Sequence, residues 1–320
     1  MLVGPPQIGK MTLALDLAMA LNCLTDKNQA PCGECSSCQK IRSGKHPDVQ
    51  VISLNQNINN EEQKERTEIG IEQINNMLHS SSLPPFEGEY RVYIIDEAGR
   101  MSVDAANRLL KTLEEPVGKI VFMLLTNSIR LLPATVVSRC QRLNLSRVKT
   151  VEVEAALITR WQLDPERAKF LARLSQGCPG WAIEANGNLN LLQERKDRCE
   201  KIIAIVRGDY SERFAVAGQL ALQFGKKREI VYEILETWLG WWRDLLLVKT
   251  KCDSDIINID FVAALAEMAG DLSLAQIKTA IRSIREAGEQ LKLNASARLV
   301  LEALMLNLPK LTLVANTIRK

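Results

Sequence analysis

The sequence has few aromatic residues, little net charge and no long apolar run. Aromatic residues make up 5% of the 320 residues, and the formal net charge at pH 7 is +3. That charge is too small to indicate a nucleic-acid-binding protein, so contact with DNA would depend on local basic patches. The apolar runs fall far short of the roughly 18 residues that cross a bilayer, and no basic segment followed by an apolar one opens the chain. We therefore expect a cytoplasmic protein that makes no contact with membranes.

The composition that is present is ordinary for a globular protein. Charged residues make up 25% and hydrophobic residues 46% of the chain, and no low-complexity tract interrupts it. A chain of this length is sufficient for two or three domains, each with its own core.

The first 146 residues alternate short apolar runs with helical stretches. This pattern is typical of parallel strands joined by crossover helices, so an α/β domain is predicted. Its five strands are predicted at residues 1–3, 49–54, 91–95, 120–125 and 141–145. A helix is predicted at "VDAANRLLKTLEE", capped by Ser102 and ended by Pro116.

Beyond the last predicted strand, only helical periodicity remains. A small helical unit is predicted at residues 147–187, where Asp164 and Pro165 begin its second helix and "GCPG" interrupts it. Residues 188–320 form a third, all-helical domain in this interpretation.

Four cysteines lie within one short insertion, at about residues 22–46. Cys23, Cys32, Cys35 and Cys38 have the spacing C-x8-C-x2-C-x2-C. Four thiolates at this spacing can surround one tetrahedral zinc ion and leave no open position for a substrate. A structural zinc site is therefore predicted. The alternative is that Cys23 merely ends an apolar helix and the other three are loop thiols without a metal.

The remaining candidate ligands are not assigned to this site. His46 precedes Pro47 and is interpreted as a loop residue. The other cysteines are scattered and are expected to be ordinary buried thiols, namely Cys140, Cys178, Cys199 and Cys252.

The opening segment, "MLVGPPQIGKM", resembles a phosphate-binding loop with one residue changed. Gly4, Gly9 and Lys10 match the pattern G-x-x-x-x-G-K-[ST], but Met11 stands where a hydroxyl should follow. That hydroxyl normally coordinates magnesium, and a thioether is a poor ligand for a cation that prefers oxygen. The nucleotide site is therefore predicted to be degenerate.

Other parts of a nucleotide-hydrolysing site follow along the chain. An apolar strand in "VYIIDEA" ends in Asp96 and Glu97, an acidic pair suited to holding the water shell of a metal and activating a water molecule. "FMLLTNS" ends another strand with Thr126 and Asn127, which could sense a γ-phosphate. "VVSRC" places Arg139 beside a short helix, as a candidate arginine finger. Each feature is weak alone, but their order favours a nucleotide-binding fold.

Trp238, Trp241 and Trp242 fall on one face of a predicted helix. Two interpretations stay open: a buried stripe in the domain core, or an aromatic contact between subunits.

Several segments together make the chain resemble the clamp-loader subunits of the AAA+ class. These segments are the zinc insertion after the first helix, "GKHPDVQ", "DEAGRMSVDAANRLLKTLEEP" and "LLPATVVSRCQRL". They resemble the delta-prime, gamma and tau subunits of bacterial DNA polymerase III, and delta-prime most of all. The resemblance is strong to about Glu184 and rests only on helical character beyond it.

The resemblance implies an AAA+ domain, a helical lid and an oligomerisation collar. It also implies a hetero-oligomeric ring with gamma or tau and delta subunits in the DNA polymerase III holoenzyme, which loads the sliding clamp onto primed DNA. In such a ring Arg139 would reach into the ATP site of a neighbour, while the chain itself would be a poor or inactive ATPase with weak or absent ATP binding.

Three departures from active relatives support the delta-prime interpretation. Met11 replaces the magnesium hydroxyl, and Ile183 in "PGWAIEA" stands where active relatives carry a second sensor arginine. The sequence also begins inside its first predicted strand, whereas relatives have a segment ahead of it, so a truncated start or an incomplete pocket is expected.

Two alternatives remain. The first is an active ATPase of the gamma or tau type, favoured by the intact Gly4, Gly9, Lys10, Asp96 and Glu97. The second is a zinc-bearing DNA-binding module, favoured only by the basic run from Lys226 to Arg228.

Overall fold

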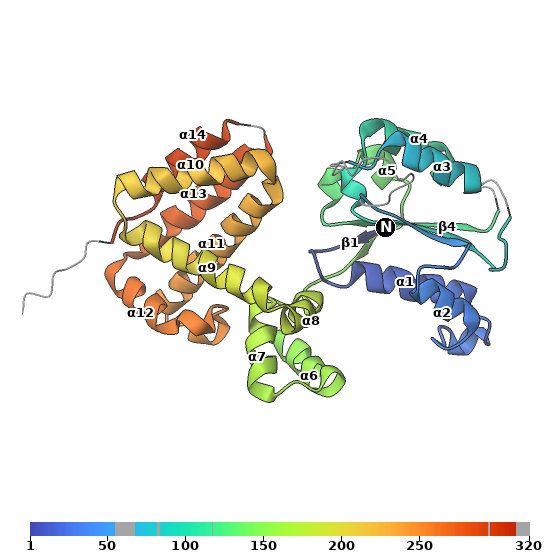
Figure 1. Ribbon diagram of the computed structural model, residues 1–320, viewed down its shortest axis with the longest axis horizontal. Coiled ribbons are helices and arrows are strands. Elements are labelled where there is room, and N and C mark those ends of the chain that lie inside the picture. Colours follow the sequence, from blue (N-terminus) through green and yellow to red (C-terminus); the bar gives the residue numbers. More distant parts are fainter. Residues whose placement is uncertain (55–67, 82–83, 117, 294, 312–320) are drawn as a thin grey trace, which may run out of the picture. The chain divides into compact units, whose positions relative to one another are not determined.

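The computed structural model describes residues 1–54, 68–81, 84–116, 118–293 and 295–311, and it divides into two compact units (Figure 1). The first unit contains Met1–Lys149 and Gly177–Trp181, and the second contains Thr150–Gln176 and Ala182–Lys320. The first break lies close to the predicted boundary at residue 146. The further division into a lid and a collar domain stays a prediction.

The first unit is built on a parallel sheet of five strands in the order β2-β3-β4-β1-β5. The strands are β1 (Leu2–Val3), β2 (Val49–Ile52), β3 (Arg91–Ile95), β4 (Ile120–Thr126) and β5 (Leu143–Asn144). In register, Leu2 lies beside Leu125 and Leu143. All five predicted strands are confirmed.

Helices cover both faces of this sheet, as Figure 1 shows. One face carries α1 (Lys10–Asn22) and α2 (Ser36–Arg42), and the other carries α3 (Ile71–Ser81), α4 (Val103–Glu114) and α5 (Ala134–Val137). The short 3-10 helices of the chain are η1 (Lys27–Gln29), η2 (Ala98–Arg100), η3 (Ile129–Leu131), η4 (Asp253–Asp255) and η5 (Ile259–Phe261).

Alternation along β3 explains why both faces are covered. Val92 and Ile94 join the core beneath α1 and α2, whereas Tyr93 and Ile95 join the core beneath α3, α4 and α5. Because neighbouring side chains of a strand point to opposite faces, a strand that is apolar throughout requires a layer of helices on each side. The doubly covered parallel sheet follows directly from this pattern.

Two predicted helix starts are confirmed by their hydrogen bonds. Ser102 accepts a bond from the backbone N–H of Ala105, 3.2 Å away, and α4 begins at the next residue. Asp164 accepts bonds from Glu166 and Arg167, and Pro165 is the first residue of α7. A side-chain acceptor at this position satisfies N–H groups that the helix itself cannot.

The remaining described elements are helical. They are α6 (Thr150–Trp161), α7 (Pro165–Leu174), α8 (Pro179–Gly187), α9 (Leu189–Arg207), α10 (Tyr210–Lys226), α11 (Arg228–Lys249), α12 (Val262–Asp271), α13 (Leu274–Lys292) and α14 (Ala297–Asn307). Their main core is a single cluster of buried residues from α9 to α14. Trp238, Trp241 and Trp242 are each 0% exposed within it. The structure therefore favours the core interpretation of the tryptophan stripe.

Candidate nucleotide and metal sites

The predicted nucleotide residues meet at one edge of the sheet. The loop after β1 carries Gly4 and Lys10, Asp96 follows β3, and Asn127 follows β4. Since β3, β4 and β1 are neighbours and parallel, their carboxyl ends lie together. This edge is where open α/β sheets bind ligands.

Backbone geometry explains both glycines of the loop. The N–H of Gly4 donates to the carbonyl of Thr126 at 3.1 Å, and a Cβ on Gly4 would lie 2.7 Å from the carbonyl oxygen of Leu145. Gly9 has a φ of +101°, a left-handed conformation that side chains disfavour. Gly9 precedes the first residue of α1, so the loop delivers the chain to a helix N-terminus, where backbone N–H groups attract anions.

Lys10 is held by oxygens of its own chain. Its Nζ donates to the carbonyls of Gly4 and Pro5 and to Oδ1 of Asn127, each at 2.8 Å. An ammonium group has three donors, so all of them are engaged. Burial lowers the pKa of Lys10 below its usual value, while the carboxylate of Asp96 opposes that shift.

A cavity of about 340 Å³ lies beside this loop. Its lining residues are Pro6, Gln7, Gly9, Lys10, Met11, Thr12, Asp96, Glu97, Leu125, Asn127 and Gly180. Met11 thus stands at the cavity, as its place in the loop predicts, and it also packs against the core cluster beneath α1. The neighbouring Thr12 offers a hydroxyl that the sequence interpretation missed. Its position next to Met11, in the first turn of a helix, could have indicated it.

The acidic pair and the two polar strand-end residues differ in their surroundings. Oδ1 of Asp96 accepts from the N–H of Glu97 at 3.0 Å, and Glu97 lies 3.6 Å from the guanidinium of Arg100. Thr126 is 2% exposed, and its hydroxyl bonds to the carbonyl of Ser128 at 2.9 Å. Only Asn127 of that pair lines the cavity. Of the two residues, Asn127 therefore borders the cavity and Thr126 does not.

Gly180 at the start of α8 contacts the loop through its backbone. Its N–H donates to the carbonyl of Gln7 at 2.9 Å, and a Cβ there would lie 2.6 Å from that oxygen. Gln7 has a φ of +56°, which is uncommon for a residue other than glycine. A glycine at position 180 is thus required for this close approach.

Arg139 lies just after α5 at the surface. Its Nε donates to Oε1 of Glu114 at 2.6 Å, and Nη1 donates to the carbonyl of Thr135 at 2.9 Å. Its side chain is 33% exposed. The structure therefore places Arg139 apart from the cavity lining and within reach of solvent, held by the carboxylate at the end of α4.

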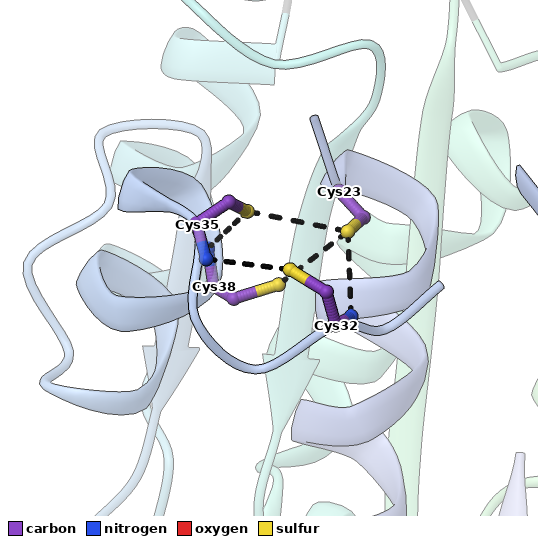
Figure 2. Close-up of side chains that lie close together, drawn as sticks. All are labelled: Cys23, Cys32, Cys35 and Cys38. Atoms are coloured by element: carbon purple, nitrogen blue, oxygen red, sulfur yellow. Dashed lines mark hydrogen bonds between the residues drawn. The ribbon is translucent and has the colours of Figure 1, made fainter. Parts of the chain in front are cut away.

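The four predicted zinc ligands converge, as Figure 2 shows. Their Sγ atoms all lie within 4.8 Å of one another, with Cys23 4.0 Å from Cys35 and 3.7 Å from Cys38. Zn–S bonds of about 2.3 Å place the sulfurs of a tetrahedral site about 3.8 Å apart. The separations therefore fit a closed tetrahedral site for one ion.

Backbone N–H groups orient these sulfurs. Cys35 donates to Sγ of Cys32 at 3.3 Å, and Cys38 donates to Sγ of Cys35 at 3.5 Å. A hydrogen bond from the side chain of Thr25, together with backbone hydrogen bonds from Cys32 and Thr25, lowers the pKa of the Cys23 thiol to about 6. Burial raises that of Cys38 to about 12. Such N–H···S bonds stabilise thiolates, the form of cysteine that binds metals.

His46 takes no part in this cluster. It is 4% exposed, and its Nδ1 accepts from the N–H of Asp48 at 3.1 Å. The other cysteines were predicted to be buried. That is confirmed for Cys178 and Cys199, whereas Cys140 is only partly buried. The prediction is wrong for Cys252, which is exposed because it lies in the loop after α11.

Two protein-family models match this chain. The family model described as DNA polymerase III, delta subunit, matches residues 1–149, and that described as DNA polymerase III, delta subunit, C terminal, matches residues 190–310. Between them they cover most of the chain. No helix within the described ranges has the length and apolar character that spanning a membrane requires.

Individual relatives agree with these models. DNA polymerase III subunit delta' of Bacillus subtilis is 27% identical over 95% of this chain and 88% of its own length. The tau subunits of Bacillus subtilis and Escherichia coli are 37% and 33% identical, but the matches span only 24% and 26% of those longer proteins. A gamma subunit-related protein from Thermotoga maritima aligns with 16% identity over 96% of this chain and 92% of its own, at a TM-score of 0.36, which is too low to carry a functional conclusion. The chain belongs to the family of DNA polymerase III delta', gamma and tau subunits.

Proposed function

We propose that this chain acts as a delta-prime-like member of a clamp-loader ring, in which it supplies Arg139 to the ATP site of a neighbouring subunit while its own nucleotide site turns over little or no ATP. Gamma or tau and delta subunits are the proposed neighbours. The assembled ring would load the sliding clamp onto primed DNA.

The environment of Lys10 and Met11 is the observation that carries this proposal. All three donors of Lys10 are bound to oxygens of the chain itself, and a nucleotide phosphate would have to displace them. The cavity presents Met11 where a hydroxyl would ligate magnesium. Both features weaken binding of a magnesium nucleotide.

The position of Arg139 supports its proposed role in trans. It lies at the surface of its own unit, outside the residues that line the cavity. A guanidinium placed in this way is available to a phosphate on another subunit. Release from Glu114 costs little, because exposed ion pairs contribute about 0–1 kcal/mol.

For the cysteine cluster we propose one structural zinc ion. With all four positions filled by sulfur, the ion has no open site for a substrate and serves to fix α2 to the end of α1. The metal would then stabilise the first unit without taking part in ATP chemistry.

The test is reconstitution of the complex with gamma or tau and delta subunits of the same organism. Arg139→Ala should lower ATP turnover at the neighbouring subunit's site by about 10³-fold or more while the subunits still assemble. Normal turnover with this change would exclude the proposed role. Calorimetry of the isolated chain with magnesium and ATP should show weak or no binding.

An active ATPase of the gamma or tau type is the second candidate. Thr12 favours it, because this hydroxyl also lines the cavity and could ligate magnesium in place of residue 11. Tight magnesium-dependent ATP binding by the isolated chain, lost in Lys10→Ala, would support this candidate over the first.

A further inference from the structure

α11 has a further face beside the buried one that carries the tryptophans. This face borders a groove of about 400 Å³ in the second unit, between α11 and α13. The groove is lined by Gln176, Glu236, Leu239, Gly240, Arg243, Leu246, Lys278, Ile281 and Arg285. Partly buried apolar side chains from both helices therefore lie next to charged ones.

The charges along the groove are mostly positive. Lys278 and Arg285 are exposed, and within the described ranges neither side chain makes a hydrogen bond or an ion pair. Arg243 uses Nη1 to bind the carbonyl of Asp255 at 3.1 Å and the carboxylate of Asp244 at 3.2 Å, yet its side chain is 47% exposed. Glu236 is the single acidic residue of the lining. The groove thus presents an excess of cations to solvent.

Two of these cations, Lys278 and Arg285, belong to a stripe of basic residues along α13. Lys278, Arg282 and Arg285 recur at spacings of four and three, which places them on one face of the helix. Like charges at such spacings destabilise a helix. An anionic partner seated along the stripe would remove this repulsion, whereas water and salt only screen it.

Gly240 leaves a gap on the α11 side of the groove. It lies in the interior of α11, a helix of 22 residues, and a Cβ built on it would meet nothing within 4 Å. Glycine in a helix interior costs stability relative to alanine. Packing within this chain therefore does not require the glycine, and the open space allows a ligand to approach the helix backbone.

We propose that this groove binds a short, acidic, amphipathic peptide segment of another protein. Its apolar side chains would pack on Leu239, Leu246 and Ile281, and its carboxylates would meet the cations on either side, Arg243, Lys278 and Arg285. Grooves that combine apolar residues with charges complementary to the partner typically bind an amphipathic helix or strand.

Nucleic acid fits the same surface less well. Single strands bind through bases stacked on aromatic side chains, and no aromatic residue lines the groove. The apolar floor would also offer nothing to a phosphate backbone. We therefore propose a peptide as the ligand of this groove. Binding of DNA is an alternative that the experiment below distinguishes.

Fluorescence anisotropy of the full chain tests the proposal with three labelled probes. The first is a synthetic 16-residue peptide of alternating Leu and Glu pairs. The second is the same peptide with Gln in place of every Glu, and the third is a 16-nucleotide oligo-dT. We expect binding of the acidic peptide, at least tenfold weaker binding of the Gln peptide, and no comparable binding of the oligonucleotide.

Two variants localise the binding. The double change Lys278→Glu with Arg285→Glu, and separately Gly240→Leu, should each weaken peptide binding about tenfold or more. As a control, the double charge reversal Lys226→Glu with Lys310→Glu lies outside the groove. It should leave the affinity for the acidic peptide within twofold of the wild-type value. Thermal melting identifies a misfolded variant, in which case Lys278→Gln with Arg285→Gln replaces it.

Three results would overturn the proposal. They are failure of the wild-type chain to bind the acidic peptide, peptide binding that survives both groove variants, and preferential binding of the oligonucleotide that the double reversal abolishes. The last result would assign the groove to DNA.

Discussion

Arg139, two residues beyond the end of α5, forms an ion pair with Glu114, the last residue of α4, and their Nε and Oε1 atoms lie 2.6 Å apart. The side chains are 33% and 48% exposed, respectively. Water screens a pair of this kind, and it contributes about 0–1 kcal/mol. An arginine finger is worth about 10³ to 10⁵ in rate, or roughly 4 to 7 kcal/mol. The pair can therefore position Arg139 without preventing its release to a neighbour.

Glu114→Gln separates positioning from catalysis. In the reconstituted complex, ATP turnover should change by no more than about fivefold, because only the exposed pair is lost. Arg139→Ala, measured beside it, should lower turnover by at least about 10³-fold. If the two variants lose the same amount, the pair itself is the functional unit and our interpretation of Arg139 alone is wrong.

Met11→Thr should restore a ligand for magnesium. We expect the ratio of ATP affinities measured with and without magnesium to rise about tenfold in this variant, because an oxygen replaces a thioether at the cavity. Calorimetry on the isolated chain measures the ratio.

Met11→Ala is the matched control, since it removes the thioether without adding an oxygen. The same rise in Met11→Ala would attribute the effect to space in the cavity. A wild-type chain that already binds ATP in a strongly magnesium-dependent way would point to Thr12 as the ligand.

Cys35→Ser should abolish zinc binding. Metal analysis of the purified wild-type chain should find about one zinc ion per molecule, and the variant should contain almost none. Because the ion would hold α2 to the end of α1, its removal with a chelator should also lower the melting temperature of the first unit.

The exposed Cys252 provides the control for this change. Cys252→Ser should retain the full zinc content. Zinc binding should release protons, because the pKa of Cys38 is raised to about 12 and its thiol must ionise to ligate. Affinity should consequently fall as the pH falls.

Asp48 gives the stability of the first unit a defined pH dependence. Burial alone would raise its pKa, but the N–H groups of Phe86, Glu87 and Gly88, at 2.7, 2.8 and 2.8 Å, and the guanidinium of Arg91 lower it below the usual 3.8. The unfolded chain therefore takes up the proton at a higher pH than the folded chain does. The stabilising contribution is complete well above pH 3.8 and is lost as the pH falls through the lowered value.

Asp48→Asn should lower the free energy of unfolding by about 1–3 kcal/mol at pH 7, because its amide cannot replace the charged acceptor. Urea unfolding from pH 7 down to about pH 2 should show this difference shrinking as the pH falls below 3.8. Asp16→Asn, at an exposed position of α1, should show no such trend. A difference for Asp48→Asn that stays constant over this range would contradict the assignment.

The strands, the loop after β1 and the cysteine cluster could be predicted from the sequence alone. The five strands could be predicted because each is a short apolar run ended by polar or turn residues. Cys32, Cys35 and Cys38 are close in the chain, so their spacing nearly dictates their proximity. The same holds for Ser102 and Asp164, whose capping bonds are local.

The groups that these residues contact depend on how the chain folds. Asn127 binds Lys10 from a position 117 residues away, and Glu114 binds Arg139 across 25 residues. The burial of all three tryptophans, which the sequence left open, depends on the helices that pack around α11. Local hydrogen bonding and periodicity act over a few residues and can be read along the chain, whereas side-chain partners and burial are set by how distant segments pack.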